Sequence, residues 1–184
     1  MRDRNRMKIS MLLAAAGAVL AGALVAPPTS AGQAPPTVLT KTPEFSASAI
    51  IIERTEPPKD LAIPEDFRVA TYENVINEVT KTGRFKQVFR SGDLRANDVP
   101  DLVTMRLLPV TFTKGSETAR GTTTVKGWSE LKIKVVITDR SGKTLVDQEV
   151  QGNVRFYGEN IEVTKDFAKK AAMVVYQNFR APGH

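Results

Sequence analysis

The most constraining feature of this sequence is a pair of alternating segments on either side of Ser141-Gly142. Before this turn, apolar residues occupy every second position: Leu131, Ile133, Val135 and Ile137. A two-residue turn would place Ile133 opposite Val150, Ile137 opposite Val146 and Lys134 opposite Glu149. One register therefore gathers apolar side chains on one face and opposite charges on the other. The sequence predicts a β-hairpin with one buried face.

The remaining periodic segments predict three more strands and two helices. Strands are expected over 45–54, inside the sheet, and over 85–89 and 102–113. A helix is expected over 64–82, because Pro64 suits a first helical turn and Gly83 a left-handed stop. A final helix carries apolar residues four positions apart: Val163, Phe167, Ala171, Val175 and Phe179. The predicted fold is a two-layer α+β domain, with about five strands in a mixed, mostly antiparallel sheet and both helices on one face.

The N-terminus has the pattern of a secretory signal peptide. Basic residues precede an uncharged run over 9–26 that is rich in Ala, Leu and Gly. We expect cleavage after Ala31, a flexible Pro-containing linker over 32–43 and a single domain over 44–181. The predicted location is periplasmic or secreted. The alternative is an uncleaved inner-membrane anchor, and membrane contact is expected only in that case.

Composition narrows the chemistry further. The chain has no cysteine, which excludes disulfides, thiolate metal sites and a lipidated N-terminal cysteine. Without the leader, 22 basic and 19 acidic residues remain, so the sequence pI of 9.7 does not indicate a nucleic-acid partner.

No catalytic signature is present. The single histidine is the C-terminal His184, and no serine lies in a nucleophile-elbow pattern. We therefore predict a protein that is not an enzyme, with no cofactor and no metal site. Acidic residues, among them Asp98 and Asp101, leave open a hydrolase of envelope polymers that uses paired carboxylates.

The connection over 114–127 supplies the first candidate binding residues. Its glycines, hydroxyls and arginine are the groups that hold a phosphate or carboxylate, so Arg120 and Ser116 are candidate ligand contacts. The Gly-Lys-Ser/Thr ending of a phosphate-binding loop is missing, and a plain strand connection explains the same residues.

The strand that follows supplies the others. Lys126, Lys132 and Lys134 could form a basic stripe on the exposed face of the sheet, beside Arg106 if the strands are neighbours. Such a stripe could meet an anionic lipid or polysaccharide, unless Glu149 neutralises Lys134. Trp128 could stack on a sugar or anchor the rim of the sheet.

The run from Gly115 to Leu145 resembles a family of bacterial exported proteins known as domain of unknown function 4410. The resemblance rests on Gly115-Ser116, Arg120, Gly127, the strand over 131–137, Asp139 and Gly142. The segments around Thr82-Gly83 and Asp101-Leu102 resemble envelope proteins related to the curli-secretion lipoprotein. Both resemblances imply an envelope location and no reaction.

Together these features predict a non-catalytic binding or assembly module of the cell envelope. Its expected partner is an envelope protein or glycan. A subunit of an envelope transport or secretion assembly is the remaining alternative.

Overall fold

The computed structural model describes residues 42–54, 56–116, 118, 127–154 and 159–183. Within them, five strands form one sheet in the order β2-β1-β3-β4-β5. The strands are β1 (Ala49–Glu53), β2 (Gln87–Arg90), β3 (Leu102–Thr113), β4 (Ser129–Thr138) and β5 (Thr144–Val154). The helices are α1 (Glu65–Lys81), the short 3-10 helix η1 (Leu94–Asp98) and α3 (Glu162–Asn178). The leader and the linker up to residue 41 lie outside the described residues.

The sheet is mixed, as the sequence predicts. Strand β1 pairs in parallel with β2 and β3, whereas β3, β4 and β5 pair antiparallel. The parallel pairs arise because α1 carries the chain back to the end of the sheet where β1 begins before β2 starts, and the segment that contains η1 does the same between β2 and β3. Ile50 and Ile52 are fully buried, and Ile51 is covered in part by a smaller cluster on the other face. The β-branched run of β1 thus lies inside the sheet.

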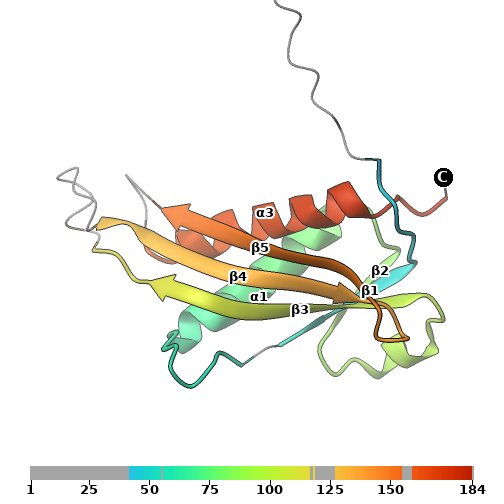
Figure 1. Ribbon diagram of the computed structural model, residues 1–184, viewed down its shortest axis with the longest axis horizontal. Helices are drawn as coiled ribbons and strands as arrows, with labels where there is room; N and C mark the ends of the chain where they lie inside the picture. Colours follow the sequence, from blue (N-terminus) through green and yellow to red (C-terminus); the bar gives the residue numbers. More distant parts are fainter. Residues whose placement is uncertain (1–41, 55, 117, 119–126, 155–158, 184) are drawn as a thin grey trace, which may run out of the picture. The chain divides into compact units, whose positions relative to one another are not determined.

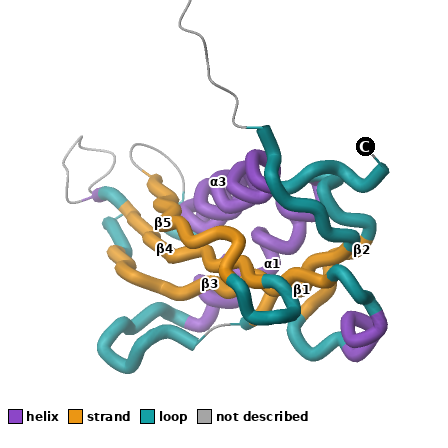
Figure 2. Tube along the Cα trace, turned by 45° about the vertical axis from the view of Figure 1, so that its right-hand side comes forward, coloured by secondary structure: helices purple, strands orange, loops and turns teal. Residues whose placement is uncertain are grey.

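Helices α1 and α3 cover one face of the sheet, as the views in Figure 1 and Figure 2 show. The apolar stripe of α3 is the centre of this packing. Every predicted member of the stripe has no measurable exposure: Val163, Phe167, Ala171, Val175 and Phe179. Burying one such side chain stabilises a fold by about 1.5–3 kcal/mol. The expected α+β fold, with two helices on one face, is confirmed.

The hairpin has the predicted register but not the predicted turn. Ile133 pairs with Val150, Ile137 with Val146 and Lys134 with Glu149. The loop contains three residues, Arg140 to Gly142, because the N–H of Asp139 donates to Lys143 and that of Gly142 to Asp139. A shift in register after Ile137 compensates for the additional loop residue. Gly142 adopts φ 84°, as the glycine of a three-residue loop with a bulge requires.

The second face of the sheet has two parts. Over β1 and β2, η1 covers a small apolar cluster: Ala49, Phe89, Ala96 and Leu102. Over β3 to β5, none of the described helices covers the sheet. We call this second part the open sheet face, and it includes Arg106, Leu108, Glu130, Lys132, Lys134, Val136, Asp147 and Glu149.

Candidate functional site

The structure describes four of the five predicted site residues, two of them beside the ends of β3 and β4 and two on the open sheet face. Arg120 lies outside the described residues. Ser116 is exposed beyond the end of β3, and Trp128 is half-buried just before β4 begins. Lys132 and Lys134 are half-buried on the open sheet face. None of the four described residues lines the pocket that lies between α1 and the sheet.

The basic stripe is largely neutralised where the structure describes it. Lys134 forms an ion pair with Asp147 at 3.0 Å, although its directly opposite neighbour is Glu149. Arg106 pairs with Glu53 at 2.8 Å. Lys132 makes no ion pair with the described residues, so it is the one uncompensated cation of the predicted stripe there. Lys126, the remaining member of the predicted stripe, lies outside the described residues.

The enclosed pocket lies between α1 and the helix-covered face of the sheet, and its volume is about 100 Å³. Its inner wall is apolar, and its mouth is charged. The lining residues are Glu53, Arg54, Glu56, Ile63, Glu65, Arg68, Val69, Thr71, Tyr72, Leu107, Pro109 and Ile133. The sequence did not predict this pocket, because its residues come from four separate segments that only the packing of α1 on the sheet brings together.

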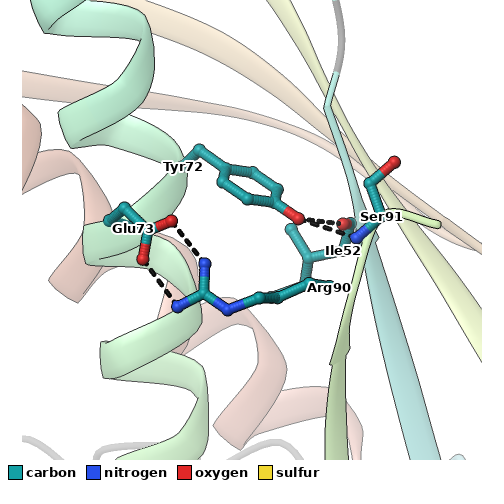
Figure 3. Close-up of polar contacts among 5 residues, drawn as sticks. All are labelled: Ile52, Tyr72, Glu73, Arg90 and Ser91. Carbon is teal, nitrogen blue, oxygen red and sulfur yellow. Dashed lines mark hydrogen bonds and ion pairs between the residues drawn. The ribbon is translucent and has the colours of Figure 1, made fainter. Parts of the chain in front are cut away.

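Tyr72 forms one wall of the pocket and fixes α1 to two strands. Its hydroxyl donates to the carbonyl of Ile52 at 3.1 Å and accepts from the N–H of Ser91 at 2.7 Å (Figure 3). The next residue of α1, Glu73, accepts two hydrogen bonds from the guanidinium of Arg90. These bonds hold the pKa of Glu73 below its ordinary value. The buried hydroxyl is fully satisfied, so it acts as a structural bridge.

The mouth of the pocket holds ion pairs. The guanidinium of Arg68 bonds both Glu56 and Glu65, and Arg54 lies 5.1 Å from the centre of the Tyr72 ring. Glu56 and Glu65 are thus both ion-paired to one guanidinium. The apolar inner wall of the pocket offers room for a small apolar group.

The carboxylates of the hydrolase alternative have separate surroundings. Asp101 accepts hydrogen bonds from the N–H of Ser48, at 2.8 Å, and from its hydroxyl. The hydroxyl bond is the main reason that the pKa of Asp101 lies below its ordinary value. Asp101 lines a groove with Asp139 at the other end of the sheet, and Asp98 is not part of that lining. The described residues also contain no group of three or more acidic residues placed to hold a metal.

The edge of the sheet formed by β5 is partly protected from pairing with another strand. At the edge strand β5, the N–H of Asn153 donates to Asp166 of α3 at 2.8 Å, and Lys170 donates to the carbonyl of Gln151 at 2.9 Å. Asp166 and Lys170 also pair with each other at 2.7 Å. Backbone groups that another chain would need for pairing are thus already occupied over this half of β5.

Exposed apolar side chains lie on two other surfaces. Leu108, on the open sheet face, is 37% exposed, and Val110 follows at the bulge of β3. On α3, Met173 is 55% and Tyr176 51% exposed, on the side away from the sheet. The sequence indicated that Met173 and Tyr176 are exposed, since both residues fall outside the apolar stripe of α3.

Comparison with known proteins supports the fold. No family model matches the chain, and no curated protein resembles it significantly. The PelC dodecamer from Paraburkholderia phytofirmans has a TM-score of 0.56, with 11% identity over 77% of this chain and 95% of the PelC chain. The chain shares the fold of that subunit. A PelC variant, also a dodecamer, gives a TM-score of 0.53 and 10% identity over 75% of this chain and 93% of that chain.

Another solved structure resembles the chain less closely. A Xanthomonas campestris protein of the family "domain of unknown function 330" has a TM-score of 0.44, with 8% identity over 74% of this chain and 86% of that chain. None of these comparisons returns domain of unknown function 4410, so that resemblance stays a prediction. Neither α1 nor α3 is long and apolar enough to cross a bilayer, a finding that covers the described residues alone.

Proposed function

We propose that this chain is a non-catalytic assembly module of the bacterial cell envelope that associates with further copies of itself. The observation that carries the proposal is the likeness to PelC, which covers 95% of a subunit that is found as a dodecamer. The whole PelC subunit thus corresponds to this one domain. An assembly role requires a rigid domain with exposed contact surfaces and needs no reactive groups.

The chemistry of the described residues supports the same proposal. The carboxylates at the pocket mouth are paired with arginine, and Asp101 is bonded to Ser48. The fold instead offers an open sheet face and an exposed side of α3. The export signal predicted over 1–31 supports a periplasmic or secreted location, and the resemblance to domain of unknown function 4410 supports an envelope setting.

The experiment expresses the full chain in a bacterium and purifies it from the envelope and periplasmic fractions. Mass spectrometry of the intact protein then locates the N-terminus, which we expect at Gly32. Native mass spectrometry and light scattering measure the number of copies. We expect a closed assembly of defined size, and a monomer at every concentration would refute the proposal. Recovery of the protein in the cytosol would refute the envelope location separately.

A further inference from the structure

Three of the exposed apolar residues, Leu108, Met173 and Tyr176, lie on two opposite sides of the domain. Leu108 belongs to the open sheet face, whereas Met173 and Tyr176 lie on α3, which covers the other face of the sheet. We define the outer helix face as Lys165, Lys169, Met173 and Tyr176 of α3, together with Arg84. Arg84 belongs to it because its guanidinium stacks on the Tyr176 ring, 3.9 Å from the ring centre.

These two surfaces also differ in charge. On the outer helix face, Lys165 is paired with Glu162, but Lys169 and Arg84 make no ion pair with the described residues. The guanidinium of Arg180, next to the end of α3, donates to the carbonyl of Pro43. On the open sheet face, Glu130 and Glu149 make no ion pair with the described residues, against the single amine of Lys132. The helix side therefore has an excess of cations and the sheet side a small excess of carboxylates.

The β5 edge of the sheet is less suited to association than these two surfaces are. Asp166 and Lys170 already occupy the outward backbone groups of Asn153 and Gln151. The remaining outward stretch of β5 carries Asp147 and Glu149, and charges of one sign on an edge oppose strand pairing. Contact between faces is then favoured over extension of the sheet from copy to copy.

We propose that the open sheet face of one copy packs on the outer helix face of the next copy. This inference rests on the proposed function and names the surfaces that perform it. Leu108 of one copy contacts Met173 and Tyr176 of its neighbour, and Lys169 and Arg84 lie opposite Glu130 and Glu149. Because the two surfaces are different and lie on opposite sides, the contact is head-to-tail, the kind that closes into a ring when the rotation per copy allows it.

Three variants test the contact. Leu108→Glu alters the sheet side and Tyr176→Glu the helix side, and both positions are exposed enough to accept a polar side chain. Leu94→Glu is the matched control, since Leu94 is 79% exposed on η1, outside both surfaces and outside the pocket lining. We expect monomers from the first two variants and wild-type assembly from the control, with unchanged thermal unfolding in all three.

Mixing the first two variants is the decisive step. Each retains one intact surface, so an equimolar mixture forms a dimer of the two variants that cannot grow further. A mixture that stays monomeric overturns the inference, as does wild-type assembly of either variant. If Tyr176→Glu assembles normally but loses binding to vesicles of anionic phospholipid, the helix side faces lipid and the inference is also wrong. A wild-type monomer would refute the proposed function itself.

Cross-linking gives a second measurement that does not depend on disrupting the contact. The chain has no native cysteine, so introduced thiols react alone. With a short bismaleimide, the double variant Leu108→Cys, Tyr176→Cys should give a ladder of linked copies, and each single variant should give almost none. Efficient dimers from either single variant would show that like surfaces meet and would overturn the head-to-tail arrangement.

Discussion

The carboxylate of Asp166 on α3 accepts a hydrogen bond from the backbone N–H of Asn153 on β5, at 2.8 Å. The ammonium of Lys170, on the same helix, donates to the carbonyl of Gln151. These two side chains thus occupy outward backbone groups over half of the edge strand β5. A helix that packs on a sheet can thus also protect the edge of that sheet. This protection matters for a domain that is proposed to meet other copies through its faces.

Removing the edge cap should promote aggregation more than it lowers stability. For the double variant Asp166→Ala, Lys170→Ala we expect the free energy of unfolding to fall by about 1–2 kcal/mol, since these are partly exposed charged hydrogen bonds. Light scattering in mild denaturant should show faster aggregation. The matched control is Glu78→Ala, Lys81→Ala, which removes an ion pair of α1 away from the edge and outside the outer helix face. Equal aggregation of both variants would contradict the protective role.

Gly152 of β5 packs directly against the backbone of α3. A Cβ atom there would lie 2.5 Å from the carbonyl oxygen of Val163 and 2.7 Å from Cβ of Phe167. Because backbone and a fully buried ring must move, Gly152→Ala should lower the free energy of unfolding by about 1–3 kcal/mol. Denaturant titration measures it, and Gln151→Ala, on the open side of the same strand, is the control. A neutral Gly152→Ala would show that α3 can shift freely.

The Tyr72 hydroxyl should contribute measurable stability. Tyr72→Phe leaves the carbonyl of Ile52 and the N–H of Ser91 without this partner, at a cost of about 1–2 kcal/mol. Tyr176→Phe is the control, because the Tyr176 ring is half exposed and its change should stay within about 0.5 kcal/mol of wild type. Thermal and denaturant unfolding measure the stability of both variants, and equal effects would contradict the bridging role of the Tyr72 hydroxyl.

Acid should weaken the contact between Ser48 and Asp101. Hydrogen bonds from Ser48 lower the pKa of Asp101 in the folded protein, so the folded state binds its proton less tightly than the unfolded chain does. This contribution to stability is complete above the ordinary carboxyl pKa, near pH 4, and is lost as pH falls through the lower folded pKa.

The variant Asp101→Asn isolates this contribution. It should be less stable than wild type at neutral pH, and the difference should shrink as pH falls below about 4. Urea unfolding at a series of pH values measures the difference. Asp98→Asn is the control, since the Asp98 side chain makes no hydrogen bond with the described residues. A difference that does not change with pH would contradict the assignment.

Local periodicity was sufficient for much of the fold. The alternation around Ile133 and Ile137 determined the register with Val150 and Val146, because a shift by one residue would expose the whole apolar set. The four-residue spacing from Val163 to Phe179 likewise determined which side of α3 is buried. The turn was predicted incorrectly, since a bulge on β5 keeps the same register with a three-residue loop.

The candidate surfaces required the tertiary structure. The sequence predicted Lys132, Lys134, Trp128, Ser116 and Arg120 as contacts, but charge type alone does not show that Asp147 reaches Lys134 diagonally. The pocket beside Tyr72 and the edge cap of Asp166 join segments that are far apart in the chain. Hydrophobic spacing thus determined the elements and their buried sides, whereas only packing decided which exposed residues share a surface, because non-local neighbours leave no period in the sequence.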